Sequence, residues 1–397
     1  MKQGWEIKKL GEIAEITDYV ANGSFATLRE NVTYLNDDGY AILVRLADYT
    51  NAFDESKFVY IDEHAYNFLA KSKLYGGEII MSNVGSIGKS FICPKLNKPM
   101  SLAPNSIVIK TPNNAFYHYL FGSTHFQSDI RGISSQTALP KFNKTSFKTI
   151  SVPVPPIEEQ ERIVAELDCL SGVIEKKREQ LKELDALAES IFYTMFGSVD
   201  DNHNNFDIKP LSDVFSLIKD GTHQTPQYTD DIENGIIFLS AKDVVSGEIN
   251  WSNIKYIPKS LHIELHKRVA PQKNDILLCK NGTYGICALN ETDEVFDIYV
   301  SLALLRPNDI CMPKYLVYAI NNKSTKLQFD KSIKGIGVPN LHLGEIKKTC
   351  IIVPPLELQQ EFADKIEAIE KQKELIKQSI TETEELFNSR MDYYFNG

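Results

Sequence analysis

Two stretches half a chain apart share one alternation of apolar and polar positions. VPVPPIEEQERIVAELD begins at Val152, and IIVPPLELQQEFADKIE begins at Ile351. After each proline pair, apolar residues recur at spacings of three and four, which predicts a helix with a narrow apolar seam. Proline suits the first helical position, and Gly197 suits the end of the first helix. We therefore predict two long helices, each of about 40 residues or about 60 Å.

The seam of each predicted helix needs a partner, because an apolar stripe of this length is not stable in water. The simplest partner is the other copy, in an antiparallel coiled coil, and the alternative is that each helix packs on its own domain. Lys177 and Lys373 interrupt the seams at different heptads, which would fix the register. We expect Lys373, Thr383 and Arg390 to weaken the second seam. The predicted seam residues are Leu167, Leu170, Ile174, Leu181, Leu184, Ile191, Ile366, Ile369, Ile376, Ile380 and Phe387.

The segments that precede these helices also repeat. GWEIKKLGEIAEI resembles NFDIKPLSDVFSL, and in a second pair of segments Gly85 and Gly88 match Gly282 and Gly285. Further similar segments follow in the same order, which predicts an internal duplication. We expect an α+β fold in which two similar mixed α/β domains are joined by the helices, with pseudo-twofold symmetry. The expected boundaries are 1–152, 153–198, 199–351 and 352–397.

Within the two larger domains the pattern predicts short elements. Runs rich in β-branched residues predict strands at 32–46, 57–63, 105–111, 235–244, 274–280 and 299–307. Amphipathic runs predict short helices at 63–72, 116–130, 259–268 and 313–327.

The charge is divided unevenly along the chain. The formal net charge is −10, and the excess acid lies in the two predicted helices, since each carries −5 while the two larger domains together are neutral. Composition therefore permits DNA binding by a basic face of those domains without showing it. The six cysteines form no CxxC pair, and no signal peptide or run of 18 apolar residues is present. These features predict a cytoplasmic protein with no membrane contact.

Candidate catalytic patterns are weak, and we assign no catalytic residue. His262 and His266 lie four apart on an expected helix and could share a metal ion. No third ligand is apparent, so we favour two surface histidines and predict no metal site. NVGSIGKS, at 83–90, is close to a phosphate-binding loop, but Asn83 stands where the first glycine belongs and no helix follows. A glycine hairpin is the favoured interpretation.

Polar loops at matched places carry the more informative pattern. The loops at 18–34 and 219–231 differ strongly while the segments around them agree, which suggests one task performed on two targets. Their side chains suit contacts with bases and phosphates, although ordinary solvated loops would look similar. The predicted DNA-binding residues are Asn22, Ser24, Thr27, Arg29, Arg45, Asn83, Ser86, Lys89, Gln136, Lys141, Thr222, His223, Gln224, Thr225, Tyr228, Lys242, Lys280, Asn281, Thr283, Tyr284 and Asn340.

The chain resembles a known family in these same segments. LPKFNKTSFKTISVPVPPIEEQERIV, its second copy GVPNLHLGEIKKTCIIVPPLELQQEF, and the loops YVANGSFATLREN and DGTHQTPQYT are similar to the specificity (S) subunit of type I restriction-modification systems. The resemblance covers nearly the whole length. Leu358 departs from it, because an acid is found at the matching Glu159, and this puts the packing of the second helix in doubt.

The resemblance implies a non-catalytic DNA-recognition subunit. Each head would be a target-recognition domain that reads one half of a bipartite asymmetric site in double-stranded DNA. The helices would set the half-site spacing and dock two modification (methyltransferase) subunits, and two restriction subunits could join. The resemblance implies no cofactor in this chain, S-adenosylmethionine in the methyltransferase, and ATP and Mg²⁺ in the restriction subunit. The alternatives are a self-sufficient DNA methyltransferase or nuclease, and a scaffold whose heads bind no DNA.

Overall fold

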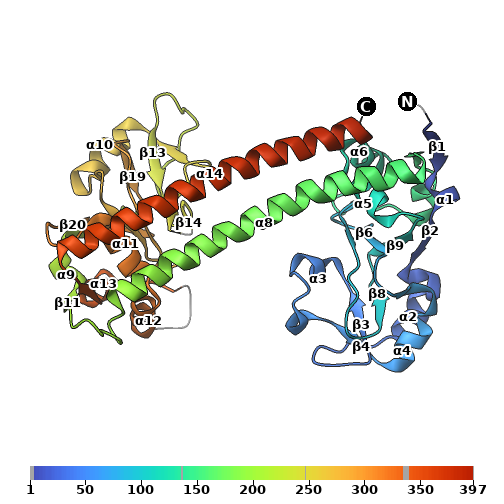
Figure 1. The fold of residues 1–397 in the computed structure, drawn as a ribbon, viewed down its shortest axis with the longest axis horizontal. Helices are drawn as coiled ribbons and strands as arrows, with labels where there is room; N and C mark the ends of the chain where they lie inside the picture. Colours follow the sequence, from blue (N-terminus) through green and yellow to red (C-terminus); the bar gives the residue numbers. More distant parts are fainter. Residues whose placement is uncertain (1–3, 136, 246, 334–338, 397) are drawn as a thin grey trace. The chain divides into compact units, whose positions relative to one another are not determined.

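The structure is a computed structural model that describes residues 4–135, 137–245, 247–333 and 339–396 (Figure 1). The chain forms two compact units. Unit 1 contains residues 1–178 and 378–397, and unit 2 contains residues 179–377. Each unit has a globular head and a part of both long helices. Among the residues that the structure describes, we find no helix with the length and hydropathy of a membrane span.

The head of unit 1 contains two four-stranded sheets. One has the strand order β2-β9-β6-β7, and the other has β4-β3-β8-β5, in which β3 and β8 are parallel. Its strands are β1 (Glu6–Lys9), β2 (Glu15–Asp18), β3 (Ala41–Val44), β4 (Tyr60–Ile61), β5 (Lys73–Leu74), β6 (Ile79–Ser82), β7 (Ser90–Ile92), β8 (Met100–Leu102), β9 (Ser106–Lys110) and β10 (Ser151–Val154). Its helices are α1 (Leu10–Ile13), α2 (Phe25–Asn31), α3 (Leu46–Thr50), α4 (Glu63–Phe68), α5 (Asn114–Gly122), α6 (Thr124–Gly132) and α7 (Lys144–Phe147), with 3-10 turns η1 (Tyr19–Asn22), η2 (Glu55–Lys57) and η3 (Ala70–Ser72).

The head of unit 2 follows the same plan. Its sheets have the orders β12-β20-β17-β18 and β16-β13-β19, in which β13 and β19 are parallel. Its strands are β11 (Asp207–Pro210), β12 (Phe215–Asp220), β13 (Ile236–Leu239), β14 (Val244–Val245), β15 (Glu248–Ile249), β16 (Lys255–Ile257), β17 (Ile276–Cys279), β18 (Cys287–Leu289), β19 (Phe296–Ile298), β20 (Leu302–Pro307) and β21 (Cys350–Val353). Its helices are α9 (Leu211–Val214), α10 (Lys259–Arg268), α11 (Pro313–Asn321), α12 (Lys323–Ser332) and α13 (Leu343–Lys348).

The predicted duplication is confirmed by this order of elements. In both heads the first strand pairs antiparallel with the strand before the long helix, β1 with β10 and β11 with β21. In both heads the second sheet contains one parallel strand pair, β3 with β8 and β13 with β19. Two short helices follow the last strand of the first sheet: α5 and α6 follow β9, and α11 and α12 follow β20. The α+β fold with two similar heads is therefore confirmed, while the domain boundaries stay a prediction.

Several predicted elements have different limits. The strand expected at 32–46 is wrong over most of its length: only Ala41–Val44 is a strand, and Leu46–Thr50 is helical. The helices expected at 116–130 and 313–327 are each two helices. The break falls at Ser123 and Asn322, whose side chains accept hydrogen bonds from Phe126 N and Ser324 N and so cap a new helix. The helix predicted at 259–268 is confirmed as α10.

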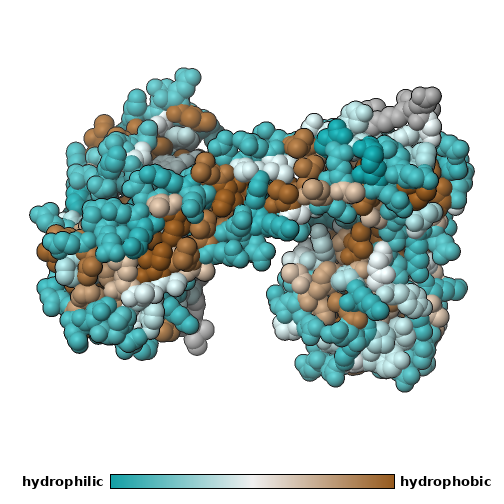
Figure 2. Space-filling model, in the orientation of Figure 1, coloured by the Kyte–Doolittle hydropathy of each residue, from teal (hydrophilic) through white to brown (hydrophobic). Residues whose placement is uncertain are grey.

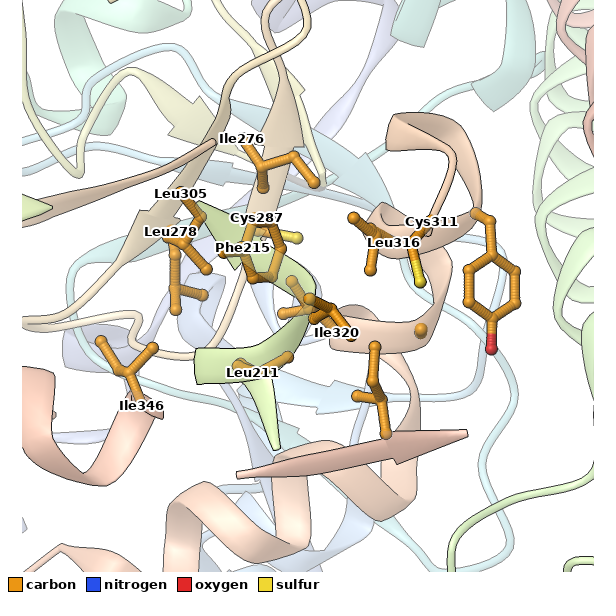
Figure 3. Close-up of a cluster of buried hydrophobic side chains, with 14 of the residues drawn as sticks. Leu211, Phe215, Ile276, Leu278, Cys287, Leu305, Cys311, Leu316, Ile320 and Ile346 are labelled. Atoms are coloured by element: carbon orange, nitrogen blue, oxygen red, sulfur yellow. The ribbon is translucent and has the colours of Figure 1, made fainter. Parts of the chain in front are cut away.

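The core of unit 2 joins its first sheet to its helices (Figure 3). Leu211, Phe215 and Ile276 meet Leu316 and Ile320 of α11, and all five are buried. The corresponding cluster of unit 1 includes Leu10, Phe116 and Phe121, together with Tyr394 and Phe395 from the end of the chain. Tyr394 and Phe395 of α14 are therefore part of the core of unit 1.

Both long helices start in the same way. The helix α8 spans Ile157–Phe196 and α14 spans Leu356–Phe395. The buried amide of Gln160 donates to Pro155 O at 2.9 Å, and Gln359 donates to Pro354 O at 2.8 Å. The matched glutamine thus fixes the proline pair that precedes each helix. Each helix begins at the residue that directly follows the second proline.

Gly197 ends α8 as predicted. Its φ is +72°, and its N–H donates to Tyr193 O at 2.7 Å. A Cβ at this position would lie 2.2 Å from Asp201 O, so the turn requires glycine.

Within unit 1 the two long helices run antiparallel. Lys177 Nζ donates to Ser379 Oγ at 2.5 Å and to Thr383 Oγ1 at 3.2 Å, and Glu166 accepts from Arg390 Nη2 at 3.2 Å. Positions that rise along α8 therefore meet positions that fall along α14. Hydrogen bonds from Arg390 and Tyr394 lower the pKa of Glu166.

Within unit 2 the helices are paired in the same sense. Lys373 Nζ lies 2.6 Å from Asp185 Oδ1, while Phe192 and Phe196 contact the ring of Phe362. The antiparallel pairing is confirmed in each unit, and Lys177 and Lys373 both have partners across the seam. Thr383 and Arg390 also have hydrogen-bond partners on α8, namely Lys177 and Glu166. These polar residues of the second seam are therefore paired across the helices.

The predicted seam residues all face inward to some degree. Leu167, Ile174, Ile366 and Ile369 are buried, and the other seven are half-buried. Leu187, Leu375 and Leu386 are 47%, 67% and 49% exposed, since they lie outside the seam.

We expect Leu167→Ala to lower the free energy of unfolding of unit 1 by about 2–5 kcal/mol, because the side chain is buried and its removal leaves a cavity. Leu386→Ala is the matched control in the same unit, and we expect it to change stability by less than about 0.5 kcal/mol. Urea unfolding of the full chain measures both. If the two substitutions changed the free energy of unfolding equally, Leu167 would not be a buried residue of the seam.

Candidate nucleic-acid interface

In each head a glycine hairpin packs against a polar segment. In unit 1 the loop 83–89 joins β6 to β7, where Gly85 N donates to Pro140 O at 2.9 Å and Phe142 N donates to Asn83 O at 3.1 Å. In unit 2 the loop 280–286 joins β17 to β18, and Leu341 N donates to Lys280 O at 2.9 Å. The repeat therefore builds the same junction in both heads.

The glycines of the hairpins are needed for geometry. Gly88 and Gly285 have φ of +80° and +81°. A Cβ on Gly88 would lie 2.6 Å from Gln127 Oε1, and one on Gly285 would lie 3.0 Å from the Phe329 ring. A strand follows each loop, so the glycine-hairpin interpretation of 83–90 is confirmed and the phosphate-binding loop is excluded.

The hairpin of unit 1 borders an open hollow of about 540 Å³. Its lining includes two cationic side chains and four hydroxyls, and none of its lining residues is acidic. Two positive charges beside hydroxyl donors suit an anionic ligand such as a DNA phosphate. The lining residues are Gly85, Ser86, Ile87, Lys89, Arg131, Ser134, Ser135, Thr137 and Pro140.

Ser86 and Lys89 are the predicted residues that this hollow brings together, and the exposed Lys141 adjoins it through the Val84–Lys141 bridge. Arg131, Ser134, Ser135 and Thr137 were not predicted. The run RGISSQT carried a signal, since it places a cation beside hydroxyls between two repeated segments. Gln136 lies outside the described residues.

The loop predicted at 18–34 is partly helical, because Ser24 caps α2 by accepting from Thr27 N at 3.2 Å. Asn22 donates to Ser72 Oγ at 2.8 Å and accepts from Lys71 N at 2.9 Å. Asn22, Ser24 and Thr27 thus hold the fold locally, while Arg29 is exposed.

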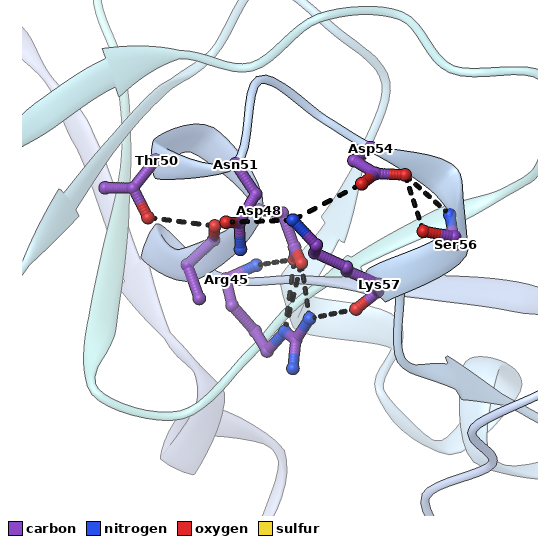
Figure 4. A network of polar contacts seen from close by, with 8 residues as sticks. Arg45, Asp48, Thr50, Asn51, Asp54, Ser56 and Lys57 are labelled. Atoms are coloured by element: carbon purple, nitrogen blue, oxygen red, sulfur yellow. Dashed lines mark hydrogen bonds and ion pairs between the residues drawn. The ribbon is translucent and has the colours of Figure 1, made fainter. Parts of the chain in front are cut away.

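Arg45 belongs to a local polar network (Figure 4). Its Nε donates to the buried carboxylate of Asp48 at 3.2 Å, and its Nη2 donates to Lys57 O at 2.6 Å. Asp48 also accepts from Arg45 N at 2.8 Å, as the cap of α3. The guanidinium of Arg45 is therefore largely engaged within the head.

In unit 2 the predicted residues of the first loop are mostly exposed. His223, Gln224, Thr225 and Tyr228 are exposed, and Thr222 is held in place by a hydrogen bond from its N–H to Ile298 O at 3.1 Å. Lys255 Nζ lies 4.3 Å from the centre of the Tyr228 ring.

Residues of the unit 2 hairpin are held by contacts within their own head. Tyr284 donates to Asp330 Oδ1 at 2.8 Å, and Asn281 bridges to Asn340. Lys242, Thr283 and Asn340 are exposed. The assignment of these residues to DNA contacts stays a prediction.

Lys280 is buried rather than presented at the surface. Its Nζ lies 2.8 Å from Asp220 Oδ2, and Arg268 Nη2 lies 2.9 Å from Asp220 Oδ1. Burial acts to raise the pKa of Asp220, but the Lys280 hydrogen bond and the nearby cations hold that pKa below its usual value. In unit 1 the corresponding strand end has a similar pair, with Lys144 Nζ 2.9 Å from Asp18 Oδ1. Both pairs position the loop that leaves the strand.

The sequence profile of the family described as type I restriction modification DNA specificity domain matches this chain twice, over residues 2–186 and 203–385. The chain belongs to this family. Two copies of the specificity domain agree with the two heads of the same plan.

The relatives to which this chain is similar include specificity subunits of type I restriction enzymes. The chain is 22% identical over 382 residues to the type I restriction enzyme MjaIX specificity subunit of Methanocaldococcus jannaschii, which covers 90% of this chain and 85% of that protein. It is 19% identical over 402 residues to the EcoKI specificity subunit of Escherichia coli K12, with 93% and 82% covered. The match to the MjaVIII specificity subunit of M. jannaschii, at 23% identity, spans 64% of this chain and 63% of that protein.

Solved structures share the fold. The S subunit of a type I restriction-modification system from M. genitalium matches with a TM-score of 0.51 at 12% identity, over 98% of this chain and 95% of that one. A chain from a study of complex assembly and conformational transition of the type I R-M system matches with a TM-score of 0.57 at 16% identity, over 100% and 98%.

We expect Lys280→Met to lower the free energy of unfolding of unit 2 by about 1–3 kcal/mol at pH 7, because it leaves the buried Asp220 carboxylate without its closest partner. The folded-state pKa of Asp220 is lowered, so the stability that it contributes is present above the unfolded-state pKa and is lost as pH falls through the folded value. The effect should therefore shrink in acid, below about pH 4.

Lys219→Met, at the exposed lysine that precedes Asp220 on β12, serves as the control. Urea unfolding across pH measures the difference. An effect of Lys280→Met that is constant from pH 7 to acid would show that the ion pair does not hold this loop.

Proposed function

We propose that this chain is the DNA sequence-specificity subunit of a type I restriction-modification complex. Each head reads one half of a bipartite, asymmetric site in double-stranded DNA. The observation that carries the proposal is the repeated family match on two heads that build the same hairpin junction with different side chains. Equal scaffolds with unequal loops suit two different half-sites.

Phosphate contacts position each head, and loop side chains read base edges. In unit 1, Lys89 and Arg131 of the hollow take the phosphate role, because they are cations on a lining without acid. In unit 2, the exposed His223, Gln224 and Thr225 take the base-reading role, since amide, hydroxyl and imidazole groups match the donors and acceptors of base edges.

Chemistry is left to partner subunits in this proposal. The chain itself is non-catalytic and takes no cofactor. Two methyltransferase subunits, which hold S-adenosylmethionine, modify adenine, and restriction subunits with ATP and Mg²⁺ join in restricting systems. The complex acts in the cytoplasm.

The long helices provide the docking surface for the methyltransferase subunits. Figure 2 shows apolar residues at several places along these helices on the face in view. The exposed apolar side chains include Val173, Leu187, Leu375 and Leu386, which have 37–67% of their surface exposed. Exposed apolar side chains on a helix that already has a partner suit a further protein contact better than they suit DNA. The acidic character of both helices favours the same choice.

Mapping of N6-methyladenine tests the function directly. Cells that express this chain with its methyltransferase should methylate a split, asymmetric motif with a fixed gap, and cells without the chain should not. A one-heptad insertion in each helix, after Arg178 and after Lys377, keeps the seam in phase and adds about 10 Å. We expect it to widen the gap by about three base pairs at about 3.4 Å each, with both half-sites unchanged.

Unchanged methylation without the chain, together with no specific DNA binding by the purified complex, would reject the proposal. An unchanged gap with the lengthened helices would reject only the spacer role. Methylation or cleavage by the purified chain alone, with S-adenosylmethionine or Mg²⁺, would favour the enzyme alternative.

The hollow of unit 1 is tested by the double variant Lys89→Ala, Arg131→Ala. Loss of two phosphate contacts should weaken binding to all DNA sequences alike and reduce the slope of log K against log salt by about two. Lys95→Ala, at an exposed lysine of unit 1 that does not line the hollow, is the control. Fluorescence anisotropy of the complex at several salt concentrations measures the slope, and a slope equal to that of the control would remove the hollow from the interface.

A further inference from the structure

A cluster of three metal-ligating side chains lies in the head of unit 2, apart from its hairpin. His262 and His266 are four residues apart on α10, so they share one face of that helix. The carboxylate of Asp297, from the centre of β19, lies beneath them. The three candidate ligand atoms lie within 4.8 Å of one another. The third ligand that the sequence did not reveal is therefore supplied by a strand some thirty residues further on.

The expectation of two surface histidines is wrong. The side chains of His262 and His266 are 18% and 34% exposed, and both face Asp297. His262 Nδ1 lies 2.7 Å from Asp297 Oδ2, and His266 Nδ1 lies 3.5 Å from Asp297 Oδ1. The two imidazole rings are 4.7 Å apart, so one small ion can reach both.

The carboxylate of Asp297 is buried and incompletely satisfied. Asp297 is 1% exposed, and its Oδ1 makes no hydrogen bond; neither does Nδ1 of His266. Among the residues that the structure describes, Asp297 forms ion pairs with these two histidines alone. The other carboxylate oxygen, Oδ2, has a hydrogen bond with His262 Nδ1. A buried carboxylate oxygen without a partner is costly and calls for an explanation.

The equivalent place in unit 1 is built differently. In the parallel strand pairs, Asp297 is registered with Phe238, and Ser101 is registered with Leu43 at the same step of its strand. The Ser101 hydroxyl donates to Ser72 O at 3.2 Å and is satisfied by the chain itself. The shared scaffold therefore does not require an acid at this position, and the acid in unit 2 occurs together with the two histidines.

We propose that His262, His266 and Asp297 form a binding site for a divalent transition-metal ion of the Zn²⁺ type. Two imidazole nitrogens and one carboxylate oxygen are a ligand set that such ions use. Ligand atoms about 2.0–2.2 Å from a tetrahedral ion lie roughly 3.4 Å apart. The 3.5 Å between His266 Nδ1 and Asp297 Oδ1 already suits such an ion, and the 2.7 Å between His262 Nδ1 and Asp297 Oδ2 widens when the ion enters. The ion displaces the proton of the hydrogen bond between His262 Nδ1 and Asp297 Oδ2, which is released to solvent. Each neutral imidazole then carries its proton on Nε2 and offers Nδ1 to the metal. A water molecule takes the fourth position.

The bound ion ties α10 to β19 and compensates the buried carboxylate. Its role is to stabilise the head of unit 2, because binding to the folded state alone raises stability by mass action. The proposal does not depend on DNA binding, and its test uses the chain without DNA.

The test uses the full chain, with no histidine tag, after a chelator has removed bound metal. Cys169→Ser is the background, because that thiol is exposed and would bind metal itself. Equimolar Co²⁺ should give d–d absorption bands that Zn²⁺ abolishes. Free Zn²⁺ about 100-fold above its Kd should raise the Tm of unit 2 by about 5–10 °C.

Two variants locate the site. Asp297→Ser copies the residue of unit 1, and His266→Gln removes one imidazole while it leaves the carboxylate paired with His262. Both should lose the Co²⁺ bands and the Zn²⁺ shift. His203→Gln is the matched control, since His203 is an exposed histidine whose Nδ1 lies 3.9 Å from Asp201 Oδ2. It should keep both signals.

The proposal is overturned if the parent chain shows neither the Co²⁺ bands nor the Zn²⁺ shift, which would leave a metal-free cluster of two histidines and a carboxylate. It is also overturned if Asp297→Ser and His266→Gln keep both signals, because the metal then binds elsewhere. These readouts come first from the parent chain, so they do not depend on the folding of a variant.

Discussion

The apolar seam of the two long helices is the constraint on which the rest of the fold depends. A 40-residue helix with one apolar stripe must bury that stripe, and the only stripe of equal length in the sequence belongs to the other half. Each compact unit therefore contains parts of both helices, although these parts are far apart in the sequence. Tyr394 and Phe395, at the end of the chain, complete the core that begins with Leu10. Unit 1 is therefore built from two separate parts of the chain, whereas unit 2 is continuous in sequence.

The seam combines apolar contacts with a few polar pairs that define its register. Lys177 with Thr383 in unit 1 and Lys373 with Asp185 in unit 2 are made only at one alignment of the helices. Buried or half-buried polar contacts of this kind add little net stability, but a shift by one heptad would leave each of them without a partner. The proline pairs give the second restriction, because the buried Gln160 and Gln359 hold the start of each helix.

Duplication supplied one scaffold, and substitution within it supplied different chemistry. The hairpin junction is the same in both heads, yet its side chains leave Lys89 exposed in unit 1 and place Lys280 in a buried ion pair in unit 2. The parallel strand of the second sheet carries Ser101 in one head and Asp297 in the other. Differences at positions that the scaffold tolerates are how two heads of one fold come to bind different things.

The sequence by itself determined the elements whose signal is periodic and local. The heptad spacing predicted both long helices and eleven residues of their seam, and the repeated segments predicted two similar heads, because these patterns reflect which face of an element is buried. Phe192, Phe196 and Phe362, which also meet between the helices, were not predicted. Short elements were less certain: Ser24, Ser123 and Asn322 start new helices through single caps that the surrounding pattern masks.

Only the tertiary structure decided which polar residues are free to act. Asn22, Arg45 and Lys280 have the residue types of DNA-binding groups, but contacts with distant or local partners engage them within the heads. Conversely, Arg131 joins Lys89 at one hollow, and Asp297 joins two histidines of α10, across separations in sequence that no spacing rule covers. The reason is physical: the identity of a side chain fixes what it can bind, whereas its burial and its partners are set by chain segments that meet only when the chain folds.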